Sequence, residues 1–194
     1  MQFYYRNFLF TSVGKNNKGN LGYHGSEIYN FRKTYLNERE DISGVIPAGD
    51  YCLGFWPTKL LPDGKWRYSS IERVRGSGYP NRPIPYLDKV TLVWFAKLPE
   101  TDELIVVGWY FDATIYRNHQ EIAEEGYVYN VRASYNNCTL LPEELRDSKI
   151  WRGPYNDIEG FGFNKVNYCP PQTDRTGYLE NLMNMIKGFT DANC

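Results

Sequence analysis

The feature that most constrains the fold is a pair of apolar segments separated by a short polar connection. Val90 to Leu98 and Leu104 to Tyr110 are rich in β-branched and aromatic residues, and the polar sequence PETDE lies between them. Segments of this composition favour strands, and a short polar connection is typical of a hairpin. The sequence therefore predicts an antiparallel pair of strands at the centre of the chain.

Further strands are predicted on both sides of this hairpin, from the same enrichment in aromatic and β-branched residues. They are Phe3 to Phe10, the end of the segment Pro47 to Trp56, Lys65 to Ser69, Thr114 to Tyr116 and Tyr127 to Ala133. A short helical turn is expected at Pro142, where the sequence PEELR begins. Strand material therefore occupies most of the central part of the chain.

Two helices are predicted, one near each end. In the first, Ser26 is a candidate N-cap, and apolar residues recur at helical spacing. These residues are Ile28, Phe31, Tyr35 and Leu36. The second follows a cap at Thr173 or Asp174, and we expect it to pack on the sheet through an apolar stripe. The stripe consists of Leu179, Leu182, Met183 and Ile186, with Tyr178, Met185 and Phe189 in a second row.

These elements predict an α+β fold with a curved, mostly antiparallel sheet or small barrel, because hairpins dominate and no βαβ rhythm is visible. The 194 residues fit a single domain. The first residues, MQFYYRNFLFTSVG, contain Arg6 within a very short apolar run, so we expect neither a signal peptide nor a membrane anchor. A cytoplasmic location and no membrane partner are the resulting expectations.

Known catalytic and metal-binding patterns are missing from the sequence. There is no phosphate-binding loop, no G-x-S-x-G motif and no C-x-x-C pair among the four cysteines, and the two histidines, His24 and His119, lie far apart. Asp102 and Glu103 are typical turn residues, and the acidic cluster from Glu121 to Glu125 is typical of a solvated surface. We therefore expect no catalytic residue, no metal site and no cofactor.

The aromatic content points instead to recognition. The chain has 17 Tyr, 10 Phe and 5 Trp, and several of the tryptophans adjoin strand ends or Pro/Gly turns. An extruded base is stabilised by flat side chains on both of its faces. The net charge of -1 argues against a uniform basic face, but a local patch is enough to bind phosphates. The segment from Arg73 to Asp88, with three arginines among its prolines and glycines, is such a patch.

Several segments resemble the EVE-like domains of the PUA-like superfamily, which also includes the YTH readers. Val106 to Arg117, VVGWYFDATIYR, is similar to the pattern V-V-G-W-Y-K-N-A-T-V-Y-R of EVE-like domains at the N-terminus of modification-dependent restriction endonucleases. Tyr129 to Arg146 follows the order of that subset. Gly54 to Thr58, GFWPT, resembles the G-x-W-x-T that supplies a cage tryptophan in YTH readers. Near the last helix, Gly162, Val166 and Tyr168 match G-Q-S-N-V-W-Y, whereas the residues between them depart from it.

The resemblance implies a PUA-like β-barrel with flanking helices spanning residues 1–194, as the N-terminal part of a longer protein. It also implies a reader of modified double-stranded DNA that flips 5-methylcytosine, 5-hydroxymethylcytosine or N6-methyladenine into an aromatic pocket. Such a module supplies specificity to a modification-dependent restriction system, and a fused or partner nuclease cleaves.

The residues expected to form this site fall into three groups. The pocket wall is predicted from Trp56, Trp109 and Trp94, the base-edge contacts from Tyr110, Asp112 and Asn164, and the phosphate contacts from Lys59, Arg73, Arg75 and Arg82. Trp109→Ala should then abolish the preference for a modified duplex and leave the fold intact. Trp109 and Tyr110 face opposite sides of a regular strand, so they can share a pocket only at a bulge or strand end. Trp94 is mid-strand, which favours the core.

Three other functions are compatible with the same residues. An RNA-binding module of the same superfamily would also use stacking and a basic groove. A protein-interaction subunit would use exposed aromatic residues at an interface. An enzyme whose active site forms no sequence motif is the third alternative.

Overall fold

The structure, a computed structural model, describes residues 8–12, 31–36, 39–41, 44–46, 48–55, 61–63, 71, 84–98, 101, 103–122, 127–148, 166–168 and 178–193. The strands are β1 (Phe8–Ser12), β2 (Phe31–Leu36), β3 (Arg39–Asp41), β4 (Gly44–Ile46), β5 (Gly49–Gly54), β6 (Tyr86–Lys97), β7 (Leu104–Ile122), β8 (Tyr127–Ser134), β9 (Cys138–Leu140) and β10 (Val166–Tyr168). The helix α1 spans Tyr178–Asn193, and two 3-10 turns, η2 and η3, span Tyr135–Asn137 and Glu143–Leu145.

Eight of these strands form one sheet. Its order in the described part of the chain is β10-β1-β6-β7-β8-β5-β2, and β9 pairs with β7 beside this path. The pair β1–β6 is parallel, whereas the other pairs of this sheet are antiparallel. Strands β3 and β4 form a separate hairpin. The predicted sheet-rich, mostly antiparallel fold is confirmed, and among the described strands the sheet is open, with β10 and β2 at its edges.

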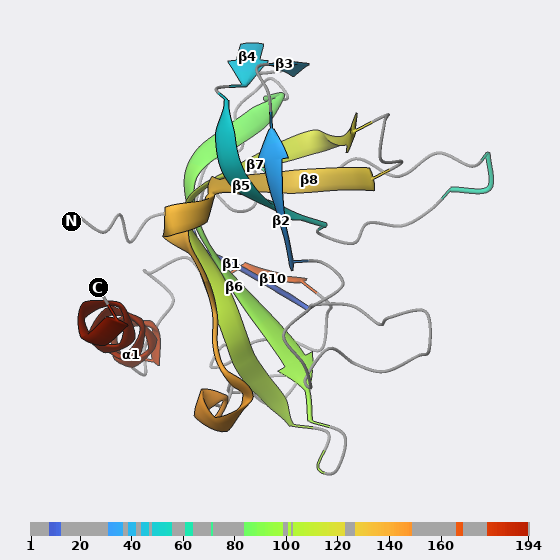
Figure 1. Cartoon of the computed structure of the whole chain (residues 1–194). Helices are drawn as coiled ribbons and strands as arrows, with labels where there is room; N and C mark the ends of the chain where they lie inside the picture. The colour runs from blue at the N-terminus through green and yellow to red at the C-terminus, as the bar shows by residue number, and fades with distance from the viewer. Residues whose placement is uncertain are drawn as a thin grey trace.

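The predicted central hairpin is confirmed as β6 and β7, and both strands are longer than expected. Thr114 to Tyr116, predicted as a separate strand, belongs to β7, which continues to Ile122. Leu98 donates its backbone N–H to the carbonyl of Glu103 at 2.7 Å and closes the connection. Figure 1 shows β6 and β7 running through both halves of the sheet and bending between them: β1 and β10 lie beside the lower half, and β2, β5 and β8 form the upper half.

Two bulges lie at this bend. In the first bulge, between the pairs Leu87↔Ile115 and Val90↔Ala113, two β6 residues lie opposite one β7 residue. In the second, between Val90↔Ala113 and Leu92↔Tyr110, two β7 residues lie opposite one β6 residue. Lys89 and Asp112, the residues next to the shared pair, have φ of 59° and 50°. A bulge residue in the left-handed region bends its strand, and two of them on neighbouring strands account for the sharp change of direction.

Two cores lie on opposite faces of the β6–β7 hairpin. The sheet-side core fills the bend of the sheet and contains Cys52, Ile71, Val90, Leu92, Trp94, Ala96, Val107, Tyr110, Ala113, Ile115, Val131 and Ala133. The helix-side core lies between the hairpin and α1 and contains Val93, Phe95, Leu104, Val106, Trp109, Phe111, Leu141, Leu182, Met183 and Ile186. The predicted packing of the last helix on the sheet is therefore confirmed, with the stripe residues Leu182, Met183 and Ile186 buried.

The predicted first helix is wrong over residues 31–36. These residues form β2, which pairs with β5 from Phe31↔Gly54 to Leu36↔Gly49. The sequence FRKTYL contains aromatic and β-branched residues that suit a strand as well as a helix, and pairing with β5 decides between them. The helical spacing of Phe31 and Tyr35 was therefore coincidental. Ser26 and Ile28 lie outside the described residues, as does the predicted strand Lys65 to Ser69.

Smaller elements agree with expectation in part. The first strand is found as Phe8–Ser12, with its predicted beginning outside the described residues. The turn predicted at Pro142 is the 3-10 turn η3, and Pro142 is its N-cap residue.

The described part of the chain contains no helix that is both long enough and apolar enough to cross a membrane.

Candidate functional site

The two tryptophans of the hairpin do not share a pocket. Both have 0% exposure, and they belong to cores on opposite faces of the sheet. Trp94 packs edge-on against Tyr110, with ring centroids 5.4 Å apart, and Trp109 packs edge-on against Phe189 of α1 at 5.6 Å. The prediction that Trp94 and Trp109 wall one base pocket is therefore corrected: in this structure both are core residues.

Two glycines, Gly54 on β5 and Gly108 on β7, show how closely the neighbouring atoms pack in this region. A Cβ atom added at Gly54 would lie 2.6 Å from Cζ2 of Trp94, and one added at Gly108 would lie 2.3 Å from the backbone oxygen of Thr139. Gly54 thus gives the indole of Trp94 its place against β5, and Gly108 lets β9 approach β7. Both contacts are closer than real Cβ atoms allow.

The expected base-edge residues Tyr110 and Asp112 are also separated. Tyr110 is fully buried in the sheet-side core, on the face opposite Trp109, as strand alternation predicted. Asp112 is exposed at the bulge. The bulge comes after Trp109 and Tyr110 in the chain, so it does not turn the two side chains to the same face.

The other predicted site residues lie outside the described residues. They are Trp56 of the pocket wall, Asn164 of the base edge, and the phosphate-binding set Lys59, Arg73, Arg75 and Arg82. Phe55, which precedes Trp56 in the chain, is described and is half-buried at the end of β5. Among the described residues, Phe55 is therefore the aromatic side chain from which a site at the end of β5 can be examined.

A large irregularity in the β7–β8 pairing lies near Phe55. The register passes from Ile115↔Val131 directly to Gln120↔Tyr129, so four β7 residues face the single β8 residue Asn130. Two of these four, Arg117 and His119, are half-buried, whereas the preceding part of β7 is almost entirely buried. The irregularity thus places polar side chains where a regular strand would continue the core.

His119 is held between an aromatic ring and an amide. Its imidazole stacks on Phe55, with ring centroids 5.2 Å apart and an angle of 27° between the planes. Its Nε2 lies 3.5 Å from Nδ2 of Asn130, a residue with 0% exposure. Burial lowers the pKa of His119 below its ordinary value. The ring is therefore neutral at pH 7, with one nitrogen able to donate a hydrogen bond and the other able to accept one.

Two arginines lie in the same region. Arg117 donates from its backbone N–H to the carbonyl of Pro85 at 2.9 Å and from Nε to the carbonyl of Ile84 at 2.7 Å, which joins β7 to the segment before β6. The guanidinium of Arg132 lies 5.4 Å from the centroid of the Tyr51 ring and 6.0 Å from that of Tyr116. Both distances are within the range of cation–π attraction.

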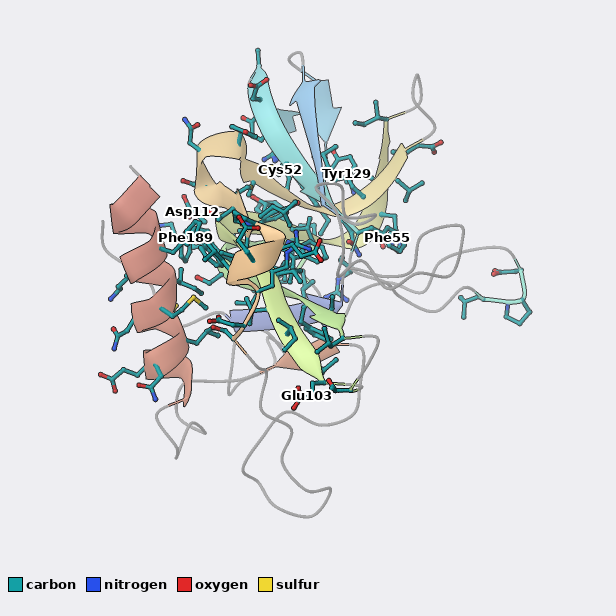
Figure 2. All side chains as sticks on the ribbon, turned by 60° about the horizontal axis from the view of Figure 1, so that its bottom comes forward. Cys52, Phe55, Glu103, Asp112, Tyr129 and Phe189 are labelled. Carbon is teal, nitrogen blue, oxygen red and sulfur yellow. The ribbon has the colours of Figure 1, made fainter. Side chains whose placement is uncertain are left out.

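We call these residues of β5, β7, β8 and the position after β5 the aromatic–cation cluster. Its members are Tyr51, Phe55, Tyr116, His119, Tyr129, Asn130 and Arg132, with Arg117 included because it directly follows Tyr116 on β7. Tyr116, Tyr129 and Asn130 are buried, and the two tyrosines belong to a third core with Leu53 and Ile122. Figure 2 shows Phe55 and Tyr129 on the side of the sheet away from α1, whereas Asp112 and Phe189 lie toward the helix. The cluster combines flat rings, a neutral imidazole, an amide and two guanidinium groups.

Sequence reasoning missed His119, Asn130 and both arginines of this cluster. A signal was present: the polar run Arg117 to Gln120 interrupts a long segment of strand-forming apolar residues. Whether this polar run lies on the surface or beside a site depends on how β7 pairs with β8, and the run alone does not specify that pairing. From the sequence, His119 is a candidate only for a metal ligand or a catalytic base, and no group of three or more possible metal ligands is found among the described residues.

Comparisons with protein-family models, with curated proteins and with solved structures found no match to this chain.

Proposed function

We propose that the protein binds nucleic acid and holds one unstacked base against the aromatic–cation cluster. The observation that carries this proposal is the Phe55–His119 stack: two flat rings, both half-buried, lie at the end of β5 where the chain continues into Trp56. A stack between an aromatic side chain and a base contributes about 1–3 kcal/mol and tolerates any base, because every base has a π face.

The polar members of the cluster suit the rest of a nucleotide. The half-buried, neutral imidazole of His119 carries one hydrogen-bond donor and one acceptor, as the edges of bases do, and the buried Asn130 lies beside it. Arg117 and Arg132 bring positive charge to the same region of the sheet, and positive charge attracts the phosphate backbone. Rings for the base and cations for the backbone are the combination that proteins use to bind single-stranded nucleic acid.

The finer proposal follows from the resemblance to EVE-like domains. The fold would be a PUA-like barrel, and the base a modified one in double-stranded DNA: 5-methylcytosine, 5-hydroxymethylcytosine or N6-methyladenine. The module would supply specificity to a modification-dependent restriction system whose cleavage is performed by a fused or partner nuclease. We propose Phe55 and His119 for the wall of this pocket instead of Trp94 and Trp109; Trp56, the next residue in the sequence after Phe55, lies outside the described residues.

The test is a binding panel of duplexes that are identical except for one modified base, measured at low salt with the full chain. Phe55→Ala and His119→Ala should each weaken binding of the preferred duplex by about 5- to 150-fold, the equivalent of one lost stack. Tyr135→Ala is the matched control, because Tyr135 is exposed and follows Ser134, the residue that pairs with Tyr51 at the end of the β5–β8 pair away from Phe55. Its binding should equal that of the unchanged protein.

Two further arms separate the alternatives. Arg132→Gln should weaken the binding of all duplexes by the same factor. It should also reduce the slope of the logarithm of the binding constant against the logarithm of salt concentration by about 1, the equivalent of one phosphate contact. RNA strands of the same sequences, tested in competition, distinguish a DNA reader from an RNA-binding module. Absence of binding to any of these nucleic acids at low salt, or equal binding by the unchanged protein and Phe55→Ala, would overturn the proposal.

A further inference from the structure

Two cysteines from distant parts of the chain meet inside the sheet. Cys52 in β5 has 0% exposure, Cys138 at the start of β9 is half-buried, and both are free thiols. Sγ of Cys138 lies 3.2 Å from the carbonyl oxygen of Ser134 as a donor, and Cys52 is close enough to Cys138 to contribute to the rise of its pKa. Cys52 belongs to the sheet-side core and Cys138 packs against that core. Both thiols are therefore enclosed by the same core.

The strands that carry them are not hydrogen-bonded to each other. β5 lies between β8 and β2, whereas β9 pairs with β7 at Gly108, Trp109 and Tyr110, just before the bend. A covalent bond between Cys52 and Cys138 would therefore connect the upper half of the sheet to the strand that runs along the lower part of β7. Among the described strands, β5 and β9 are joined only through β8 and β7 and not by direct backbone pairing.

We propose that Cys52 and Cys138 are a latent disulfide that closes on exposure to a peroxide. In the first step the Cys138 thiol and one molecule of hydrogen peroxide give Cys138 sulfenic acid and water. In the second, the sulfur of Cys52 attacks the sulfur of the sulfenic acid, the disulfide forms, and the thiol proton leaves with the hydroxyl group as a second water. Two thiols are oxidised and one peroxide is reduced, so the reaction is balanced.

The burial of the two thiols sets the order of these steps. Cys138 is the partly exposed one, so a small oxidant reaches it first, and Cys52 then acts as the resolving thiol from inside the core. Burial, together with the contact with Cys52, raises the pKa of Cys138, so the thiol is protonated at neutral pH. Because the thiolate is the nucleophile, the reaction should be slow at pH 7 and faster as pH rises.

The experiment uses the full chain and hydrogen peroxide as the oxidant, at pH 7 and pH 9. After quenching, remaining thiols are alkylated and the protein is digested and mapped by mass spectrometry. The expected product is a Cys52–Cys138 cross-linked peptide that has lost two hydrogen atoms and forms faster at pH 9. Cys52→Ala should accumulate sulfenic acid at Cys138, which dimedone traps, and Cys138→Ala should leave Cys52 reduced.

The same mapping can overturn the proposal without either variant. In the unchanged protein, Cys138 advancing to sulfinic acid while Cys52 is still alkylated would show that the pair does not resolve. Pairing of Cys138 with Cys169 or Cys194 as often as with Cys52, or no cross-link at either pH, would have the same meaning. Peroxide treatment in urea is the control, because pairing that depends on the fold should become non-selective there. The inference does not depend on nucleic-acid binding.

Discussion

The two parts of β7 carry aromatic and polar residues in different surroundings. From Leu104 to Tyr116 every side chain except that of Asp112 is buried, and the strand supplies both the sheet-side and the helix-side core. From Arg117 to Glu121 the residues are half-buried or exposed, and the pairing with β8 is irregular. An aromatic residue on the first part, Tyr116 of the cluster included, therefore stabilises the fold, whereas the half-buried Phe55 and His119 at the second part have surface left to bind a ligand.

The largest expected effect tests the first part of β7. Trp109→Ala should lower the free energy of unfolding by about 3–5 kcal/mol, because it removes a fully buried ring that packs against Phe189 and leaves a cavity. Urea unfolding followed by circular dichroism measures the change, and the exposed Tyr135→Ala should stay within about 0.5 kcal/mol of the unchanged protein. Unchanged stability of Trp109→Ala combined with a lost base preference would return Trp109 to the binding site.

A smaller loss is expected from Gly108→Ala in the same part of the strand. The new methyl group would lie 2.3 Å from the backbone oxygen of Thr139, and backbone yields less easily than a flexible side chain. The expected cost is about 1–3 kcal/mol in the same unfolding measurement. Gly188→Ala on α1 is the matched control, since nothing lies within 4 Å of its added Cβ and a helix gains about 0.5–1 kcal/mol from this change. Equal stability of the two variants would contradict the close packing of β9.

Residue patterns predicted the parts of the fold whose signal is local. The β6–β7 hairpin followed from two strand-forming segments, and the packing face of α1 followed from the spacing of Leu182, Met183 and Ile186. β2 was missed because the spacing of Phe31 and Tyr35 fits a helix as well as a strand. The pairing with β5, a segment outside the predicted helix, selects the strand. Tertiary pairing overrides local propensity in such short segments.

The candidate site was less accessible to sequence reasoning than the fold. Trp109 follows a glycine, a pattern that suggested a pocket. In the structure it is enclosed by its pairing partners on β6 and β9 and by α1. His119 and Asn130 meet because four residues of β7 are accommodated opposite one residue of β8. That excess depends on how two strands align along their whole length, and no single segment contains the information.

The second part of β7 is tested by the effect of pH. The pKa of His119 is lowered by burial, so below pH 6.5, the ordinary value, the unfolded chain takes up a proton more readily than the folded protein. Stability should therefore fall as pH is lowered through about 6.5 and should stop falling once the folded histidine is also protonated. His119→Gln should flatten this part of the curve, measured by thermal unfolding between pH 7.5 and pH 5. A curve that is the same with and without His119 would contradict the buried, neutral imidazole.

The smallest expected effect concerns the bend itself, where Asp112 interrupts the buried run of β7. Its φ of 50° is in the left-handed region, which costs most side chains about 1–2 kcal/mol and glycine nothing. Asp112→Ala should therefore be less stable than Asp112→Gly by about 1 kcal/mol in urea unfolding, even though Gly also gains freedom in the unfolded chain. The exposed carboxyl contributes little that either change would remove. Equal stability of the two variants would mean that residue 112 can leave the left-handed region at no cost, so that the bend within the buried part of β7 is held by the flanking cores and not by this bulge.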